Sequence, residues 1–240
     1  MFSVDMTHAR NHPLSIFLFF SSCIIIDNIQ YSKLLPTNNK EEVLDFFDQH
    51  YVREEPFCAY QVSAGHLGRN WSTNLSKTID ENLSIVARDL NSKMVGVLLN
   101  SEIRANDPLI NRCGEVHKDS FTRIRLDRPV DNQLFDFQQI LKAHNVKKML
   151  RVGKAVVHRD YRNKGISKNY WWVTKSYYQN EYQYAITVCT SLYSKLAIES
   201  LGFTLWDELR YENVLVDGKH FFDTDDFNRS CKCYIKELSV

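Results

Sequence analysis

The sequence lacks an excess of charge of either sign. Its 30 Lys and Arg residues against 29 Asp and Glu residues give a formal net charge of +1. A protein that attracts nucleic acid through its overall charge needs a clear positive excess or a basic-aromatic signature, and neither is present. We therefore expect no nucleic-acid partner, and any site for an anion has to be local.

The chain also lacks an apolar run long enough to cross a membrane. The stretch from Pro13 to Ile26 is largely apolar but covers only fourteen residues, whereas a spanning helix needs roughly 20. It is a poor secretory signal, because Asp5 and one arginine precede it and no small-x-small cleavage site follows. A signal or anchor stays open as an alternative. We expect an extension over residues 1–25 that feeds the first strand, with no stable membrane insertion.

Closely spaced cysteines are scarce. Six cysteines are scattered along the chain, and only Cys231 and Cys233 stand close together. On a strand, alternation would place both on one face. No second Cys or His pair stands nearby to complete a zinc site, so no metal is expected. Buried, reduced thiols are the favoured interpretation, and they suit a cytoplasmic protein.

No repeat, low-complexity tract or linker divides the remainder, so residues 26–240 are expected to form a single domain. Strands separated by single helices predict a mixed α/β (α+β) domain around one central sheet. Asn91 and Ser92 join two apolar runs as a hairpin. The polar stretch 101–131 has no readable pattern. Strands are predicted at 29–34, 83–90, 93–100, 149–158, 184–190, 203–212 and 233–238, and helices at 37–51, between 61 and 71, and at 135–146, 166–179 and 191–200.

The segment from Val156 to Ser167 reads VVHRDYRNKGIS and runs from a short strand through a charged loop into a helix. Gly165 permits a positive φ and close approach of a ligand to the backbone. The first N–H groups of the helix point outward and suit an anion, and Arg162 and Lys164 add positive charge beside them. By itself this Arg-x-x-Gly-x-small pattern is weak, because many loops that enter helices contain an Arg and a Gly.

The same segment resembles the acetyl-CoA-binding segment of the GNAT superfamily of N-acetyltransferases, a strand followed by Arg/Gln-x-x-Gly-x-Gly/Ala. The strand at 184–190, the next helix and Leu-Gly-Phe at 201–203 continue the likeness. The sequences REEPF (53–57) and CTSLYSKLAIESLGF (189–203) are similar to elements of the insect-type arylalkylamine N-acetyltransferases. The resemblance implies the GNAT fold, a twisted mixed sheet of about seven strands flanked by helices and splayed between the strands at 150–158 and 183–189.

The resemblance implies a role for each matched position. Glu55 would take the proton from the substrate's ammonium group, usually through water. Thr190 and Ser194 would place hydroxyl groups near the thioester, and Ser194 would protonate the leaving thiolate. These roles meet the needs of the reaction, since the amine must lose a proton and the carbonyl oxygen must be stabilised. Acetyl-CoA would be bound by Ala155, Val157, Arg162, Asn163, Lys164, Gly165, Ile166 and Ser167.

Three positions depart from the family pattern. Ser167 replaces the second Gly or Ala, which crowds the diphosphate slightly but keeps the N–H group. Thr190 stands where the subfamily usually has Ser, so the hydroxyl is kept with tighter rotamers. Ile198 occupies the position at which many GNAT enzymes have a catalytic Tyr. The acid must then come from elsewhere, and Ser194 is our choice, with the neighbouring Tyr193 as the alternative.

Simpler interpretations of these residues stay open. Glu54 and Glu55 could be a solvated pair at the end of a helix, as exposed carboxylates usually are. Thr190 or Ser191 could cap the following helix, which is compatible with catalysis. His158 is better interpreted as a surface histidine than as a base. The aromatic run from Asn169 to Trp172 predicts core packing.

The implied function is transfer of an acetyl group from acetyl-CoA to a small primary amine, in particular an arylalkylamine, by direct attack on the thioester. A non-catalytic acyl-CoA-binding or regulatory protein on the same fold is the alternative. Phe57, Tyr60 and Trp71 would suit an aromatic amine, although aromatic side chains pack cores more often than they line pockets.

Overall fold

The computed structural model describes residues 18–20, 23–35, 40–55, 58–59, 71–105, 124–126, 135–216, 219–220 and 229–238 of the chain. Pro56, Phe57, Tyr60 and Cys113 lie outside these residues, as do the expected helix caps at 38–39 and most of the polar stretch 101–131. In the described part of the chain, no helix is both long enough and apolar enough to cross a membrane.

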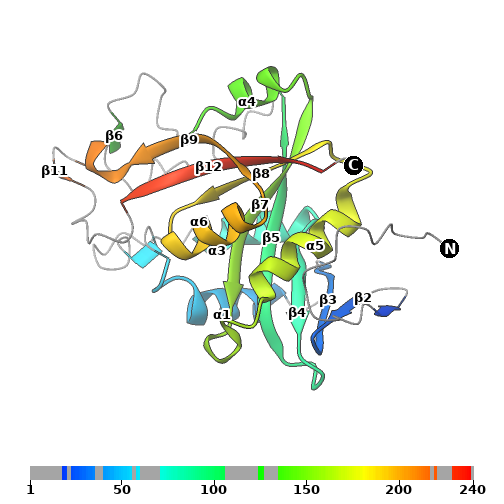
Figure 1. Cartoon of the computed structure of the whole chain (residues 1–240). Coiled ribbons are helices and arrows are strands. Elements are labelled where there is room, and N and C mark those ends of the chain that lie inside the picture. The colour runs from blue at the N-terminus through cyan, green and yellow to red at the C-terminus, as the bar shows by residue number, and fades with distance from the viewer. Residues whose placement is uncertain are drawn as a thin grey trace.

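A nine-stranded mixed sheet forms the body of the protein, in the order β1-β2-β3-β4-β5-β7-β8-β12-β9 (Figure 1). Neighbouring strands are antiparallel, apart from the parallel pair β7 and β8. All the predicted strands are found, and β1 and β2 extend the sheet ahead of residue 26. The strands are β1 (Leu18–Phe20), β2 (Cys23–Ile26), β3 (Ile29–Lys33), β4 (Ile85–Arg88), β5 (Met94–Arg104), β7 (Lys148–Val157), β8 (Tyr184–Cys189), β9 (Thr204–Arg210) and β12 (Ser230–Glu237). A separate small sheet contains β6 (Ile124–Leu126), β10 (Val214–Val216) and β11 (Lys219–His220).

Helices cover both faces of the large sheet. One face carries α5 (Ile166–Tyr178) and α6 (Leu192–Ser200), which lie in front of the sheet in Figure 1. The other face carries α1 (Lys40–His50), α3 (Trp71–Asp80) and α4 (Phe137–Ala143). Two short 3₁₀ helices, η2 (Arg159–Tyr161) and η3 (Tyr211–Asn213), follow β7 and β9.

Three buried apolar clusters hold these layers together. The first packs α5 on the sheet, and Tyr170 and Trp171 belong to it, which confirms the predicted core role for these two residues. Trp172, in the same run, is 44% exposed, so the prediction is wrong for it. The second packs α4 against β8, β9 and β12 and contains Cys231 and Cys233, both buried and free as expected. The third joins α1 and α3 to β4 and β5, with Phe47 at its centre.

The helix α3 was not predicted. The helix expected between 61 and 71 lies outside the described residues apart from Trp71, at which α3 begins. Its sequence, WSTNLSKTID, has few apolar residues, so periodicity does not single it out. Leu75 and Ile79, four positions apart, form its buried face against α1 and β5.

The sheet opens between β7 and β8. These strands pair only through Leu150 with Ala185 and Arg151 with Ile186, although β7 has ten residues. In Figure 1, β8, β9 and β12 run away from the direction of β5 and β7. Beyond the paired residues, Lys154 and Ala155 are exposed to solvent although their strand is in the middle of the sheet. The predicted splay is confirmed, and beyond Arg151 it leaves the edge of β7 without a described partner on the β8 side; we call this place the splay cleft.

A β-bulge at Gly153 shifts the pairing register between β5 and β7. Asn100 pairs with Val152 but Leu98 pairs with Ala155, so β7 carries one extra residue there. A Cβ atom on Gly153 would lie 2.3 Å from the carbonyl oxygen of Leu99. The close backbone approach therefore requires glycine at this position.

Candidate active site

The loop after β7 enters α5 through Gly165, as predicted. Gly165 is the N-cap residue with a φ of 78°, and no side chain caps the helix. A Cβ atom at Gly165 would meet no atom within 4 Å, so the space in front of the helix is open. Ile166 is buried in the core and anchors the first turn, while Asn163 and Ser167 are exposed. The arrangement presents uncapped N–H groups to an anion.

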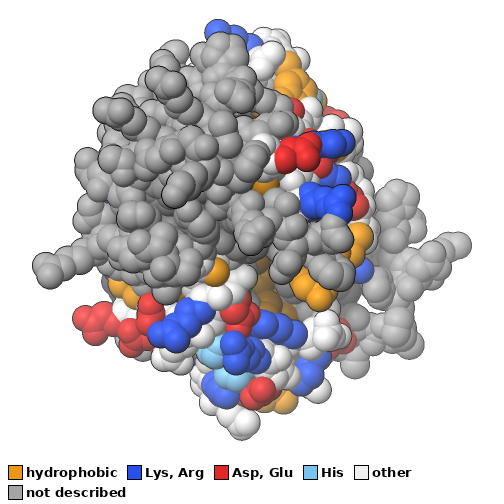
Figure 2. Space-filling model, turned by 90° about the vertical axis from the view of Figure 1, so that its left-hand side faces the viewer, with side chains coloured by type: hydrophobic (Ala, Val, Ile, Leu, Met, Phe, Trp, Pro, Cys, Tyr) orange, Lys and Arg blue, Asp and Glu red, His pale blue; other side chains and the backbone are white. Residues whose placement is uncertain are grey.

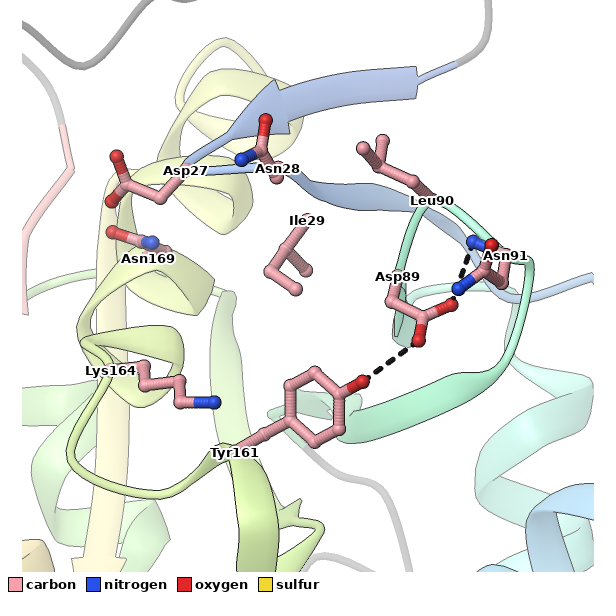
Figure 3. Close-up of a pocket in the computed structure, with 9 residues that line it drawn as sticks. All are labelled: Asp27, Asn28, Ile29, Asp89, Leu90, Asn91, Tyr161, Lys164 and Asn169. Carbon is pink, nitrogen blue, oxygen red and sulfur yellow. Dashed lines mark hydrogen bonds between the residues drawn. The ribbon is translucent and has the colours of Figure 1, made fainter.

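A hydrogen bond holds this loop to the turn between β4 and β5. The hydroxyl group of Tyr161 donates to Oδ2 of Asp89 at 2.8 Å, which lowers the pKa of Asp89. The Nζ atom of Lys164 lies 4.7 Å from the centre of the Tyr161 ring. Both side chains line a pocket of about 450 Å³ (Figure 3). Its lining residues are Asp27, Asn28, Ile29, Asp89, Leu90, Asn91, Tyr161, Lys164 and Asn169.

Arg162 is held by an acidic residue from the segment after α1. Its Nη2 atom lies 2.6 Å from Oε2 of Glu54, and its Nε donates to the carbonyl oxygen of Val157 at 3.1 Å. Arg159 approaches the other oxygen of Glu54 at 2.7 Å. Partial burial acts to raise the pKa of Glu54, but the hydrogen bonds from Arg159 and Arg162 outweigh it and lower the pKa. Glu54 is therefore an ion-pair partner and not the free solvated carboxylate that was one of the open interpretations.

Glu55 lies beside Thr190, as the proposed catalytic roles require. The Thr190 hydroxyl donates to Oε1 of Glu55 at 2.6 Å, and the backbone N–H of Cys58 donates to Oε2 at 2.8 Å. Tyr211 approaches from η3, and its hydroxyl donates to the carbonyl oxygen of Thr190 at 3.0 Å. Two donors thus orient the Glu55 carboxylate next to the end of β8.

Ser194 belongs to the cap of α6. The Ser191 side chain accepts from the N–H of Ser194 at 3.2 Å, and the Ser194 hydroxyl donates to the carbonyl oxygen of Ser191 at 2.8 Å. This capping box confirms the structural interpretation of the hydroxyl residues at the helix start. Tyr193, the alternative acid, is 85% exposed on the helix surface. Ser194 lies in the first turn of α6, beside the Cys189 thiol at the end of β8.

The strand backbone at Ala155 and Val157 has one free edge. Towards β5, Ala155 pairs with Leu98 and Val157 with Gly96. Towards β8, no described residue pairs with β7 beyond Arg151. The free edge borders the splay cleft and offers backbone groups to an extended ligand.

The site contains residues that the sequence did not point to. Tyr211 has no sequence signal, because it follows a strand without any motif, and burial raises its pKa. Arg151 and Lys154 stand on β7 ahead of the loop, and Lys154 interacts electrostatically with Glu55. Strand alternation alone would place these two residues on opposite faces, and only recognition of a bulge at Gly153 would have indicated otherwise.

Two histidines lie beside the ion pairs of Glu54. The ring of His50, at the end of α1, is 4.5 Å from the ring of His158. Burial, and then the neighbouring His158, lower the pKa of His50. His158 accepts the N–H of Asp160 through Nδ1 at 3.2 Å, so its side chain caps η2. In Figure 2 the pale-blue histidine side chains lie among basic and acidic ones on the lower part of the face shown.

No protein-family model matches the chain, and no curated protein matches it in sequence. Its structure is similar to arylalkylamine N-acetyltransferase 2 from Aedes aegypti, with a TM-score of 0.70 and 20% identity over 88% of this chain and 100% of that one. A polyamine N-acetyltransferase of Drosophila melanogaster that forms N-acetylagmatine gives a TM-score of 0.66 and 15% identity, over 87% and 99% of the two chains. A putative arylalkylamine N-acetyltransferase 7 of the yellow fever mosquito gives 0.67 and 17%, over 88% and 87%. The chain therefore has the GNAT fold, as the resemblance implied.

Proposed function

We propose that the chain is an acetyl-CoA-dependent N-acetyltransferase whose acceptor is a primary amine, in particular an arylalkylamine. The observation that carries the proposal is the hydrogen bond between Thr190 and Glu55 beside the splay cleft of a GNAT fold. It joins a carboxylate after α1 to a hydroxyl after β8, which are the two positions to which the resemblance assigns proton transfer and the thioester.

The described residues fit acetyl-CoA as the co-substrate. The uncapped start of α5 at Gly165 suits a diphosphate, because N–H groups and the helix dipole both favour negative charge there. The free edge of β7 at Ala155 and Val157 suits the amide groups of an extended pantetheine arm. Acetyl-CoA would supply the acetyl group, and the chain would bind and orient it.

Glu55 is the group that we assign to deprotonation of the amine. A protonated amine has no lone pair with which to attack a thioester, so a base near it is required. Thr190 and the N–H of Cys58 hold the carboxylate in place. We assign protonation of the leaving thiolate to Ser194, in the first turn of α6. The helix cap already holds its hydroxyl group in place, so the group does not need to be ordered during the reaction.

Two measurements test the proposal. Acetyl-CoA at about a hundred times its dissociation constant should stabilise the folded chain by about 2.7 kcal/mol in a thermal melt. The rate at which free CoA thiol is released should then rise with the concentration of enzyme and with that of the amine. The amines to compare are tryptamine, dopamine, tyramine, histamine and polyamines. Stabilisation without thiol release from any amine would favour the non-catalytic acyl-CoA-binding alternative, and absence of stabilisation would reject both.

A further inference from the structure

Arg151 and Lys154 project from the same face of β7. Met149 packs in the cluster with α4, and Val156 packs in the cluster with α1 and α3, so both mark the face of those helices. Arg151 stands two residues after Met149, and Lys154 stands two residues before Val156, so each points to the same face as that neighbour. Residues 151 and 154 would otherwise point to opposite faces, but the extra residue at the Gly153 bulge places both on one face. Two cationic side chains therefore line a polar strip between two apolar clusters.

Neither cation makes a direct ion pair within the part of the chain that the structure describes. No ion pair or donated hydrogen bond is found there for Arg151 or Lys154, and the buried Nε atom of Arg151 lacks a hydrogen-bond partner. Other cations near the sheet behave differently, since Arg162 pairs with Glu54 and Lys148 pairs with Glu181. A buried guanidinium nitrogen without a partner is costly unless a ligand completes its hydrogen bonds.

The strip adjoins the candidate base. Lys154 interacts electrostatically with Glu55 and Cys58, and Tyr51 interacts with both Glu55 and Arg151. Lys154 is exposed to solvent, yet desolvation lowers its pKa, and the charge of Arg151 lowers it further. Lys154 therefore borders the space that an amine must enter to reach Glu55.

The hydrogen-bond donors of this space do not match a simple amine. Arg151 and Lys154 contribute two positive charges, and Glu81 and Glu55, which interact electrostatically with them, contribute two negative charges. An acceptor whose only charge is its ammonium group would leave the donors of both cationic side chains without acceptors. A carboxylate on the same acceptor would supply the acceptor atoms that both side chains lack.

We propose, on the basis of the proposed function, that the acceptor amine also carries a carboxylate, which binds between Lys154 and Arg151 while the amino group faces Glu55. The acceptor is then an amino acid, an aromatic one where the rest of the molecule is an arylalkyl group. Lys154 and Arg151 select the substrate and take no part in proton transfer.

Matched pairs of acceptors test the proposal, because tyrosine and tyramine, or tryptophan and tryptamine, differ only in the carboxylate. The wild-type chain should acetylate the amino acid with a kcat/KM about tenfold or more above that of the amine, the effect of one charge-assisted hydrogen bond. A higher kcat/KM for tyramine and tryptamine would overturn the proposal and leave the proposed acetyltransferase function standing.

Substitutions at Lys154 identify the residue that makes the selection. Lys154→Met should lower kcat/KM for tyrosine by about tenfold and leave that for tyramine unchanged or higher, and Lys154→Glu should reverse the preference. Lys147→Met is the matched control, an exposed lysine seven residues earlier and roughly 20 Å away along the strand direction. Equal losses for tyrosine and tyramine in Lys154→Met, or weaker acetyl-CoA binding, would show that Lys154 does not bind a substrate carboxylate.

A binding measurement separates this proposal from the proposed function. Calorimetric titration of N-acetyltyrosine and N-acetyltyramine into the chain with CoA present requires no turnover. Tighter binding of N-acetyltyrosine, lost in Lys154→Met, would support the carboxylate site even if no amine is acetylated. Equal binding of the two products would reject the site even if acetyl transfer is observed.

Discussion

The carboxylate of Glu54 lies 2.6 Å from the guanidinium group of Arg162, so the residue next to the candidate base is bound to the loop that enters α5. The two elements stand more than a hundred positions apart, and Arg159 adds a second ion pair to the same carboxylate. Glu54 thereby fixes the segment that carries Glu55 against the end of β7. The same contact places a negative charge beside the expected diphosphate site.

Replacement of Arg162 should weaken acetyl-CoA binding. Arg162→Ala removes a cation at the start of α5, and we expect a loss of about 1.5–3 kcal/mol, the range for a charge-assisted hydrogen bond. Lys142→Ala is the control, because Lys142 is exposed on α4, on the opposite face of the sheet from α5. Calorimetric titration of CoA measures both. An Arg162→Ala protein with unaltered CoA affinity would show that the diphosphate does not lie at Arg162.

Replacement of Glu54 should change stability in a pH-dependent way. The pKa of Glu54 is lowered in the folded chain, so its ion pairs stabilise the fold above the pKa of the unfolded chain, and this contribution is lost as pH falls through the folded pKa. Glu54→Gln should cost about 1 kcal/mol near pH 7, because the pairs are partly exposed, and progressively less as pH falls through the pKa of Glu54 in the folded chain. Thermal melts across this range measure the difference. A constant difference at all pH values would indicate that packing, and not charge, is lost.

Replacement of Glu55 should impair turnover and spare acetyl-CoA binding. Glu55→Gln keeps the shape but removes the base, so kcat/KM should fall by ~10²–10⁴-fold at neutral pH. The loss should shrink as pH rises towards the pKa of the amine, because more substrate is then already deprotonated. Glu41→Gln, at an exposed position in the first turn of α1, is the control. Activity of Glu55→Gln near that of wild type would reject Glu55 as the base.

Removal of the Thr190 hydroxyl should disturb the orientation of Glu55. Thr190→Val keeps the shape but deletes the donor at 2.6 Å from Oε1, and a hydrogen bond to a charged group is worth about 1.5–3 kcal/mol. We expect kcat to fall by about tenfold or more, with recovery in Thr190→Ser, which keeps the hydroxyl. Steady-state kinetics with a saturating amine check this. Equal rates for the Val and Ser variants would limit Thr190 to a structural role.

Replacement of Gly153 should destabilise the fold. In Gly153→Ala the new Cβ would lie 2.3 Å from the Leu99 carbonyl oxygen, so the backbone at the bulge must shift, at a cost of about 1–3 kcal/mol. Gly165→Ala is the comparison, since its Cβ would meet open space and only the positive φ opposes it, at about 1–2 kcal/mol. Denaturant unfolding measures both. A Gly153→Ala protein as stable as wild type would show that the bulge relaxes without cost.

Local sequence patterns were enough for much of the fold. The hairpin of β4 and β5, the strand–loop–helix around Gly165 and the start of α6 were predicted, because spacing, turn residues and caps act over a few positions. The helix at 37–51, observed as α1, was predicted for the same reason. The helix α3 was missed, because only Leu75 and Ile79 mark its buried face, and they become recognisable when α1 and β5 pack on them.

The sequence by itself determined which residue types stand in each helix and strand. Through the family resemblance it also indicated Glu55, Thr190 and Ser194 as candidate catalytic residues. Only the tertiary structure decided their partners. Glu55 meets Thr190 across 135 positions, and Glu54 meets Arg162 because the end of α1 packs on the end of β7. Arg151 and Lys154 share a face because one glycine bulge shifts the alternation. Such contacts depend on strand register and helix packing, which arise from the whole chain and leave no signal in any short stretch of it.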